Sequence, residues 1–273
     1  MAHNKSHATF GRLLLTGAAG GLGQQLRPRL AKYARHVRLS DIADLAPASG
    51  PHEELFQTRL EDSQAMLALL EGVDAVIHLG GISVERPFDE ILQANIVGVY
   101  NLYEAVRRQG VRRVVFASSN HVTGFYRQDE VIDTKAPPRP DGLYGVSKAF
   151  GENLAQFYYD RYGVETVSIR IGSSFPVPRD ARMLATWLSY DDLERLVARA
   201  LLAPVVGHTV IYGVSANTVK WWDNRHAAHL GYVAQDCSEP FREEVMAQQV
   251  PLDPQDPASY AQGGAFVRAG PFE

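Results

Sequence analysis

Short apolar runs alternate with helical stretches over the first two-thirds of the chain, and this alternation constrains the fold more than any other feature. Strands that are apolar nearly throughout are typical of a parallel sheet that helices cover on both faces. Because helical patterns separate the runs, we predict an α/β fold with a doubly wound parallel sheet. The runs predicted to be strands cover residues 12–16, 36–40, 54–58, 74–79, 112–118 and 165–171.

The pattern changes after Ile171. The tail beyond Pro251 is rich in Pro, Gly and Gln, which predicts a surface position. We expect residues 1–172 to form the main domain and residues 173–273 a small substrate-side lobe, together one compact unit. In this lobe we predict an irregular loop at 172–183, a helix at 191–203, a short strand at 209–212 and a helix that starts at the anchoring pair Trp221 and Trp222.

Charge and composition exclude several classes of protein. The 27 Lys and Arg residues against 31 Asp and Glu residues give a net charge of −4, which offers no general attraction to nucleic acid. The single cysteine, Cys237, excludes an internal disulfide and a cysteine zinc site. No apolar run reaches the roughly 18 residues of a membrane span, and residues 1–12 lack a signal peptide. We expect a cytoplasmic protein that uses neither metal nor membrane.

A glycine-rich loop follows the first predicted strand directly. Gly17, Gly20 and Gly23 stand in TGAAGGLG, ahead of a predicted helix. This spacing permits a tight turn and the close approach of a pyrophosphate, and the helix N-terminus offers free N–H groups. Asp41 ends the second predicted strand, at about the separation expected of an acid that binds the adenosine ribose. The loop and the acid predict a Rossmann-type site for NAD, because a carboxylate repels the 2′-phosphate of NADP.

Tyr144 and Lys148 begin another predicted helix. Residues four apart share a helix face, so the ammonium lies near the phenol. Positive charge favours the phenolate, which can then act as a general base toward an alcohol. Ser118 and Ser119 end the fifth predicted strand, at the edge where α/β sheets bind ligands, and a hydroxyl there can hold the reacting oxygen. These groups predict a dehydrogenase.

Longer motifs extend this pattern. TGAAGGLG, HLGG, SSNHVTG and YGVSK together resemble the extended short-chain dehydrogenases/reductases. More narrowly, the chain from about Arg12 to its C-terminus resembles the bacterial uronate dehydrogenases. The motifs that carry this resemblance are GGISVERPF, FASSNHVTGFY, RPDGLYGVSKAFGENLA, RIGSSFP, WWDN and QGGAFV.

The resemblance implies NAD-dependent oxidation of a hexuronic acid, D-glucuronate or D-galacturonate, at C1 to an aldarolactone. It assigns Tyr144 as the base, Lys148 as its partner and Ser119 as the hydroxyl that positions the C1 oxygen. The positions that match substrate contacts are Ser83, Ser119, Asn120, His121, Ser173 and the carboxylate anchor Arg182. The positions that match cofactor contacts are Gly17, Gly20, Gly21, Leu22, Gly23, Asp41, Ile42, Leu60, Leu79, Gly80, Gly81, Lys148 and Ser174.

Two positions need separate comment. Arg59 stands where the family usually has an Asp that bonds the adenine amino group, and Arg cannot accept that hydrogen bond. In the loop after the sixth predicted strand, the residue types alone make Arg179 and Arg182 equal candidates to bind a substrate carboxylate. Only the resemblance favours Arg182.

Two other functions stay open. A nucleotide-sugar epimerase or dehydratase of the same superfamily needs a larger C-terminal lobe than residues 173–273 provide. A non-catalytic NAD(H)-sensing regulator on this fold typically lacks the tyrosine and lysine, and Tyr144 and Lys148 are both present. We expect the partners to be a small-molecule substrate and further copies of the chain in a homo-oligomer, with Phe157 and Tyr158 as core or dimer-face residues.

Other polar side chains fit structural roles better than chemical ones. We expect His78, at the end of the fourth predicted strand, to be a packed core histidine. His226 and His229 have helical metal spacing, but no clear third ligand joins them, and a surface helix face explains them. Asn95 lies mid-helix, where we expect it to bond a bulged backbone beneath the site.

Overall fold

Seven parallel strands form one sheet in the order β3-β2-β1-β4-β5-β7-β8. The computed structural model describes residues 9–250, 253–270 and 272, so the leading residues 1–8 and the start of the predicted tail lie outside it. All six strands predicted from the sequence are present. The strands of the sheet are β1 (Phe10–Thr16), β2 (Ala34–Asp41), β3 (Glu53–Gln57), β4 (Ala75–His78), β5 (Arg113–Ser119), β7 (Glu165–Ile171) and β8 (His208–Gly213).

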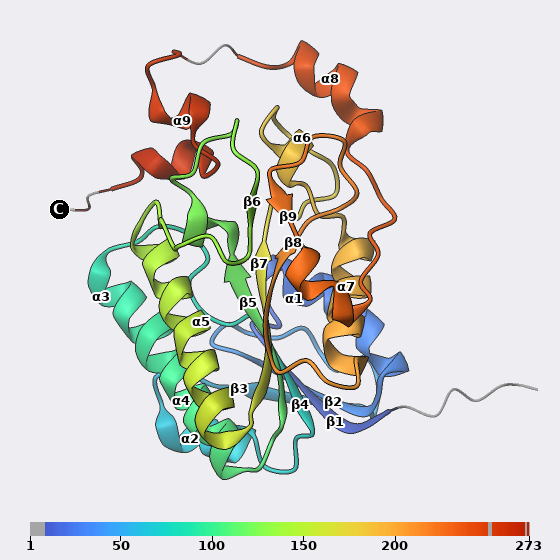
Figure 1. Cartoon of the computed structure of the whole chain (residues 1–273). Helices are drawn as coiled ribbons and strands as arrows, with labels where there is room; N and C mark the ends of the chain where they lie inside the picture. The colour runs from blue at the N-terminus through green and yellow to red at the C-terminus, as the bar shows by residue number, and fades with distance from the viewer. Residues whose placement is uncertain (1–8, 251–252, 271, 273) are drawn as a thin grey trace, which may run out of the picture.

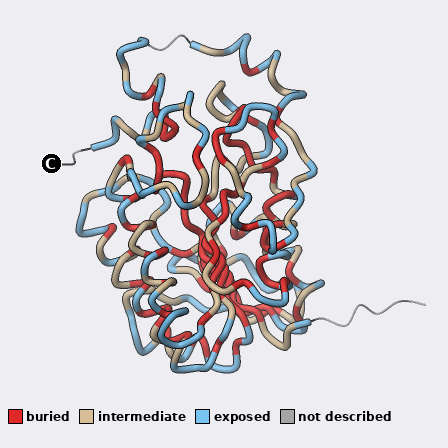
Figure 2. The backbone as a smooth tube through the Cα atoms, viewed as in Figure 1, coloured by how far each residue is buried: buried red, intermediate tan, exposed pale blue. Residues whose placement is uncertain are grey.

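Helices cover both faces of the sheet, which confirms the doubly wound α/β prediction (Figure 1). Leu13, Leu14 and Leu15 of β1 are all fully buried, because successive side chains point to opposite faces and each face carries a helical layer. Figure 2 shows this buried sheet at the centre of the molecule. The helices are α1 (Gly21–Leu26), α2 (Ser63–Leu69), α3 (Phe88–Ile91), α4 (Gly98–Arg108), α5 (Leu143–Tyr162), α6 (Met183–Thr186), α7 (Tyr190–Leu202), α8 (Arg242–Ala247) and α9 (Pro257–Tyr260).

The two helical layers have separate apolar cores. On one face, Leu26 of α1 and Leu196 of α7 pack in the same cluster as Leu13 and Leu15. On the other face, Leu102 of α4 and residues of α2 and α5 pack with Leu14. The helix predicted at 144–162 is α5, and Gly163 ends it in a left-handed conformation with φ of 70°.

The C-terminal part contributes to the main sheet as well as to the site. The strand predicted at 209–212 is β8, which pairs with β7 at the edge of the sheet rather than lying in a lobe of its own. Helix α7, predicted at 191–203, packs on the same core as α1. The division into two parts at residue 172 stays a prediction from the sequence. Beyond that residue, β8 completes the sheet and α7 completes one helical layer.

The prediction of a helix that starts at Trp221 and Trp222 is wrong. Trp222 instead begins the short strand β9 (Trp222–Asp223), which pairs with β6 (Ile132–Asp133). Both indoles are buried in a cluster with Tyr212, whose ring stacks on Trp222 at a centroid distance of 4.8 Å. Burial of two large aromatic faces overrides the local helical spacing, and the pair does anchor this part of the chain.

The prediction that the tail lies on the surface holds for most of its described residues but is wrong for Ala258 and for residues 261–264, which are buried. Gln262 is fully buried, and Gly263 and Gly264 beside it are buried too. The Gln262 side chain accepts a hydrogen bond from Trp222 Nε1 and donates to the carbonyls of Arg127 and Glu130. The glycines let the backbone of this segment pack closely on its neighbours. Glycines are also common in surface loops, which is why the composition suggested one.

Among the described residues, no helix is long and apolar enough to cross a membrane.

Candidate active site

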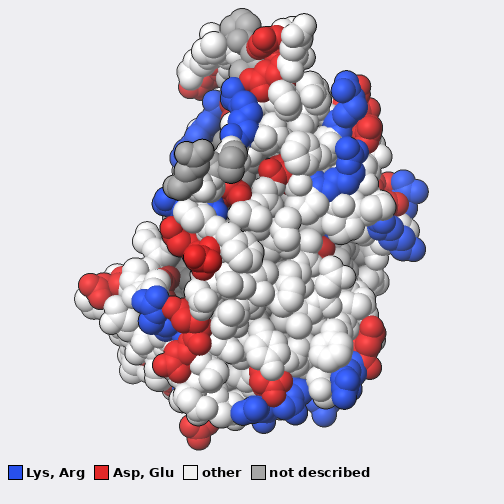
Figure 3. Space-filling view, turned by 90° about the vertical axis from the view of Figure 1, so that its left-hand side faces the viewer, with Lys and Arg blue, Asp and Glu red and all other residues white. Residues whose placement is uncertain are grey.

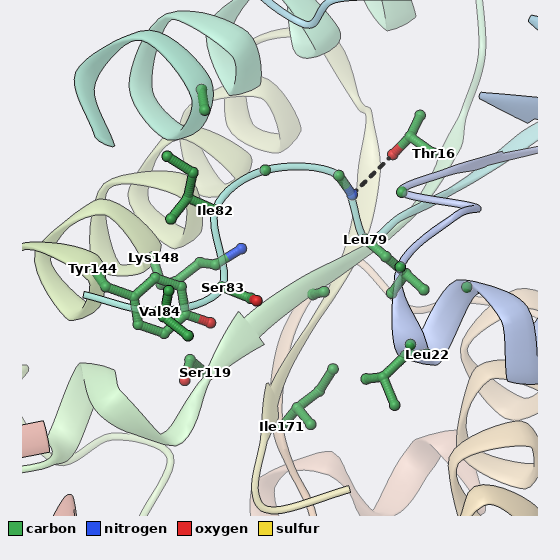
Figure 4. Close-up of a pocket in the computed structure, with 18 of the residues that line it drawn as sticks. Thr16, Leu22, Leu79, Ile82, Ser83, Val84, Ser119, Tyr144, Lys148 and Ile171 are labelled. Carbon is green, nitrogen blue, oxygen red and sulfur yellow. Dashed lines mark hydrogen bonds between the residues drawn. The ribbon is translucent and has the colours of Figure 1, made fainter. Parts of the chain in front are cut away.

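A cavity of about 1300 Å³ opens at the carboxyl ends of the central strands, between β1 and β4 and their neighbours. Parallel α/β sheets bind ligands at this edge, where the strand order reverses. Figure 4 shows Tyr144, Lys148, Ser83 and Ser119 together at one end of the cavity, with Leu22 at the other. The cavity is therefore long enough to have a cofactor end and a substrate end.

The glycine loop leaves a backbone cradle at the cofactor end. Gly17 has φ of +72°, and a Cβ there would lie 2.6 Å from the Leu79 carbonyl carbon. A Cβ on Gly23 would lie 2.1 Å from the Gly17 oxygen, whereas Gly21 faces open space. The Ser174 hydroxyl, which also lines the cavity, is buried without a hydrogen-bond partner in the described part of the chain. These features fit a dinucleotide, with the pyrophosphate over the loop.

Asp41 lines the cavity at the end of β2. Its Oδ2 accepts a hydrogen bond from the Ala19 amide at 2.9 Å, and its Oδ1 accepts one from the Ala43 amide at 3.0 Å. These amides hold the carboxylate where an adenosine ribose would lie beside the glycine loop. Arg38 points away, because it donates to Glu54 and to the Leu69 carbonyl. The other predicted cofactor contacts that line the cavity are Gly20, Leu22, Ile42, Leu60, Leu79, Gly80 and Gly81.

Arg59 is present at the adenine end of the cavity but is paired within the chain. It forms an ion pair with Glu61 at 2.6 Å, and both residues line the cavity. Asp62, next along the chain, does not line the cavity, since its carboxylate caps α2 through the amides of Gln64 and Ala65. This part of the cavity is therefore lined by an Arg59–Glu61 ion pair in place of a free carboxylate.

Tyr144 and Lys148 lie on one face of the first turns of α5, as their spacing predicted. The Lys148 ammonium lies 5.6 Å from the centre of the Tyr144 ring and 5.2 Å from that of Phe116. Burial raises the pKa of Tyr144 to about 12, although a hydrogen bond with Ser119 opposes this rise. Burial lowers the pKa of Lys148 to about 8. The phenol alone is therefore a weak base, and it needs positive charge beside it to lose its proton.

We expect Lys148→Met to raise the free energy of unfolding while it abolishes most turnover. The folded protein holds Lys148 at a pKa of about 8 against 10.5 for a free lysine, so its charge destabilises the fold below pH 8. The gain is at most about 3 kcal/mol at pH 7. It should shrink between pH 8 and pH 10.5, where the buried lysine is already neutral and the unfolded one loses its proton.

Urea unfolding at several pH values measures this gain, with Lys220→Met at an exposed lysine as the control. A Lys148→Met protein that is no more stable than the parent at pH 7 would show that its charge is compensated.

Ser119, Asn120 and His121 follow one another where β5 ends, and all three are buried and line the cavity. His121 Nδ1 hydrogen-bonds to Asp141 Oδ2 at 2.7 Å, and its ring stacks on Phe266 at a centroid distance of 3.8 Å. Burial lowers the pKa of His121 below its ordinary value, with Asp141 opposing. Because a carboxylate only accepts, the neutral ring carries its proton on Nδ1 and leaves Nε2 as an acceptor for a substrate hydroxyl.

Arg182 lines the substrate end of the cavity and is held by uncharged groups. Its Nε donates to the Gln262 carbonyl at 2.6 Å and its Nη1 to the Ser173 hydroxyl at 3.2 Å. With the Asn120 amide oriented to satisfy its neighbours, Nη2 donates to Asn120 Oδ1 at 2.7 Å. Among the described residues, no carboxylate lies within 4 Å of this guanidinium. Arg182 is thus a positioned cation with N–H groups to spare for an anion.

Arg179 differs from Arg182 although both line the cavity. Its side chain is exposed, and its guanidinium lies 3.9 Å from the centre of the Phe175 ring. An exposed cation that stacks on an aromatic ring is screened by water and gains little from one more anion. The two arginines that the sequence left equal are therefore distinguished by their surroundings.

Comparison with known proteins agrees with this geometry. Residues 13–190 match the NAD dependent epimerase/dehydratase family. The uronate dehydrogenase of Pseudomonas putida is 62% identical over 263 residues, which are 96% of this chain and 98% of that protein. The chain belongs to the uronate dehydrogenases of this family. It is an NAD-dependent oxidoreductase.

Solved structures of uronate dehydrogenases share the whole fold. The glucuronic acid dehydrogenase from Chromohalobacter salexigens superposes with a TM-score of 0.93 at 58% identity, covering 95% of this chain and 97% of that one. A mutant uronate dehydrogenase from Agrobacterium tumefaciens complexed with NAD gives a TM-score of 0.94 at 51% identity, covering 97% and 99%. NAD as the cofactor of this uronate dehydrogenase agrees with the cradle at Gly17 and with Asp41.

Four residues of the site were not predicted from this uronate dehydrogenase sequence. Glu85 and Asp141 come from loops before α3 and α5, and Gln262 and Phe266 come from the C-terminal tail. Both tail residues stand within the motif QGGAFV, which signalled the resemblance but no role. Their contacts join segments far apart in the sequence, and no local pattern reveals such contacts.

The histidines that the sequence set aside have structural partners. His78 is fully buried beside Thr16 Oγ1 at 2.7 Å, and burial lowers its pKa to about 3, so it is a packed, neutral core residue. His226 contacts Asp133, and His229 contacts Thr209. Within the part of the chain that the structure describes, no three His, Cys, Asp or Glu residues gather as a metal site would require.

Proposed function

We propose that this chain oxidises a free hexuronate, D-glucuronate or D-galacturonate, at C1 to the aldarolactone with NAD, using Tyr144 as the general base. The observation that carries this proposal is that one cavity holds both a set of groups for alcohol oxidation and a group for binding a carboxylate. A tyrosine, lysine and serine that suit alcohol oxidation lie together at its substrate end (Figure 4), and an arginine that suits a carboxylate, with no ion-pair partner among the described residues, lines the same cavity. A hexuronate is a sugar that carries both an oxidisable C1 hydroxyl and a carboxylate.

Each residue has a distinct task in the proposed reaction. Ser119 holds the C1 oxygen, and Tyr144 Oη takes the proton of the C1 hydroxyl. The Lys148 ammonium stabilises the phenolate, which burial alone disfavours. NAD held by the glycine loop and Asp41 would supply the acceptor for the hydride of C1 and a positive charge near the phenol. When the C1 hydroxyl has lost its proton and C1 its hydride, C1 is a carbonyl bonded to the ring oxygen, which is the lactone.

The substrate end supports a free sugar acid. Arg182 can form two parallel hydrogen bonds with a planar carboxylate, and Gln262, Ser173 and Asn120 fix the plane of its guanidinium. Phe266 of the C-terminal tail lines the cavity and stacks on His121, so the tail forms part of the wall at the substrate end. A wall at this position supports a small free uronate over the larger substrate of an epimerase or dehydratase.

An NADH-formation screen tests the proposal. Purified protein is assayed with D-glucuronate, D-galacturonate, glucose, galactose and UDP-sugars at matched concentrations. We expect fast NADH formation with the two uronates only. Activity confined to UDP-sugars would favour a nucleotide-sugar enzyme, and NAD(H) binding without turnover of any sugar would favour a regulator.

We expect NAD to be preferred over NADP by at least about tenfold in kcat/KM, because the 2′-phosphate of NADP would meet the like charge of Asp41. Asp41→Ala should reduce this preference mainly by lowering kcat/KM for NAD. Steady-state assays with both cofactors measure it. Asp44→Ala, at a nearby carboxylate that does not line the cavity, is the matched control. Equal use of both cofactors by the parent protein would contradict the assignment of Asp41.

The sequence also predicts a homo-oligomer in the cytoplasm. The exposed aromatic residues Tyr100, Phe157, Tyr159 and Tyr162 lie on the adjoining helices α4 and α5. Figure 3 shows a broad stretch without charged side chains on this side of the molecule. An apolar face of this kind supports contact between copies. Light scattering on the purified protein would test it, and the location stays a prediction.

A further inference from the structure

A short loop over the substrate end of the cavity is fastened to the helix that carries Tyr144. The loop, residues 82–85, follows β4 and contains Ser83, which lines the cavity beside Tyr144 and Lys148 (Figure 4). Both its ends are hydrogen-bonded, directly or through side chains, to the first turns of α5. These contacts are not part of the proton transfer described above.

Glu85 makes the attachment at the far end of the loop. Its Oε1 accepts a hydrogen bond from the Leu143 amide and its Oε2 one from the Tyr144 amide, each at 2.8 Å. The first amides of a helix have no partner within the helix, and the residue before α5, Gly142, has no side chain to cap them. A carboxylate at this end is also favoured by the helix dipole. Glu85 therefore caps α5 at the catalytic residue itself.

The cap requires a glycine at position 142, because a side chain there would collide with Glu85. A Cβ at that position would lie 2.3 Å from Glu85 Oε2, so any other residue would displace the carboxylate. The backbone of Gly142 is extended, and its conformation alone would accept other residues. The glycine thus leaves room for a cap that comes from another part of the chain.

Asn95 makes the attachment at the near end of the loop. Its side chain exchanges two hydrogen bonds with the backbone of Ile82, at 2.8 and 3.0 Å, and donates to Ser147 Oγ at 2.9 Å. Ser147 Oγ in turn donates to the Tyr144 carbonyl at 2.7 Å. Asn95 lies in the π-helical segment Leu92–Val97 and is buried, as is Ser147. Asn95 does bond backbone, as the sequence predicted, but its partner is this loop at Ile82 rather than a bulge beneath the site.

These contacts form a closed ring around Tyr144. Its amide donates to Glu85, its carbonyl accepts from Ser147, which in turn accepts from Asn95, and the loop joins Glu85 to Asn95. We propose that Glu85 is a positioning residue of the reaction, because it fixes the backbone of Tyr144 and thereby couples the phenol to Ser83 across the substrate. The proposal rests on the proposed function insofar as Tyr144 is the base.

The test is Glu85→Ala, together with Glu85→Gln, which keeps one acceptor for the two amides. We expect kcat on the uronate to fall about 100-fold in Glu85→Ala and about tenfold in Glu85→Gln, because a shift of about 1 Å at a catalytic group costs this much. The dissociation constant of NADH should change less than about twofold in both, since the glycine loop is untouched. A kcat within twofold of the parent in Glu85→Ala would overturn the proposal.

Asp62→Ala is the matched control. Asp62 caps α2 through two amides, at 3.0 and 2.9 Å, as Glu85 caps α5, but no residue of α2 lines the cavity, whereas α5 carries Tyr144 and Lys148. Loss of either cap should lower stability by a similar amount, whereas only loss of Glu85 should lower kcat. An Asp62→Ala protein that loses as much kcat as Glu85→Ala would show a general effect of cap removal and would overturn the proposal.

Hydrogen exchange separates this inference from the proposed function. Mass spectrometry of Glu85→Ala should show faster exchange in peptides that contain residues 143–148 and unchanged exchange in those of β1 and α1. This readout needs no substrate. Failure of the parent protein to oxidise uronates would refute the proposed function alone. Unchanged hydrogen exchange at residues 143–148 in Glu85→Ala would refute the proposal that Glu85 fixes the backbone of Tyr144.

Discussion

Tyr144→Phe lowers turnover of the uronate by about 10²–10⁴-fold, the range typical of losing a general base. The variant lacks the phenol oxygen that takes the proton of the C1 hydroxyl, while the ring and its packing near Lys148 and His121 stay. The NADH dissociation constant should stay near that of the parent protein, because the phenol contributes little to dinucleotide binding. Steady-state kinetics and a fluorescence titration with NADH measure the two quantities.

The control for this variant is Tyr126→Phe. It removes a phenol oxygen that bonds the Pro137 carbonyl away from the cavity, so turnover should stay within about twofold. If Tyr144→Phe kept near-normal turnover, the base would have to be another residue. His121, whose Nε2 is free to accept a proton, would be the first candidate.

Arg182→Ala lowers kcat/KM for uronates by roughly 30-fold to several thousand-fold. Removing one partner of a buried charge pair costs on the order of 2–5 kcal/mol, because the substrate carboxylate is left desolvated and unpaired. Arg182→Lys should recover only part of this loss, since an ammonium keeps the charge but not the planar fork. Activity on glucose or galactose, where it can be detected, should change little.

Arg179→Ala is the control for the carboxylate anchor. Its guanidinium is exposed and stacks on Phe175, so we expect a mild effect on uronate oxidation. The assignment of Arg182 fails if Arg179→Ala is the crippling change. It fails also if Arg182→Ala loses uronates and neutral sugars alike, because the arginine would then support the site without recognising the carboxylate.

Local chemistry made much of the cofactor end predictable. A glycine loop between a strand and a helix is recognisable because its backbone geometry permits few other residue types. The acid at the end of the next strand is recognisable by its position. The structure bears this out at Gly17 and Gly23, where any Cβ would collide with backbone. Tyr144 and Lys148 were predictable for the same reason, since helical spacing alone brings them to one face.

The substrate end depended on contacts between distant segments. Arg182 and Arg179 look alike in the sequence, and one of the groups that hold Arg182 is the Gln262 carbonyl, 80 residues further along the chain. The tail that supplies this carbonyl was expected on the surface, because its glycines and polar residues are also typical of loops. Residues 261–264 are buried here, and the Gln262 side chain hydrogen-bonds to Trp222 and to the carbonyls of Arg127 and Glu130, as a buried amide needs.

The sequence by itself determined the sheet of buried parallel strands, the glycine loop with Asp41, and the placing of Tyr144 beside Lys148, because each depends on spacing within one strand, loop or helix. The tertiary structure alone decided that β8 joins the sheet, that Trp222 lies in a strand, and that Glu85 and Gln262 hold Tyr144 and Arg182. The physical reason is that burial and hydrogen bonding between segments far apart in the chain outweigh local preferences of a few tenths of a kcal/mol per residue.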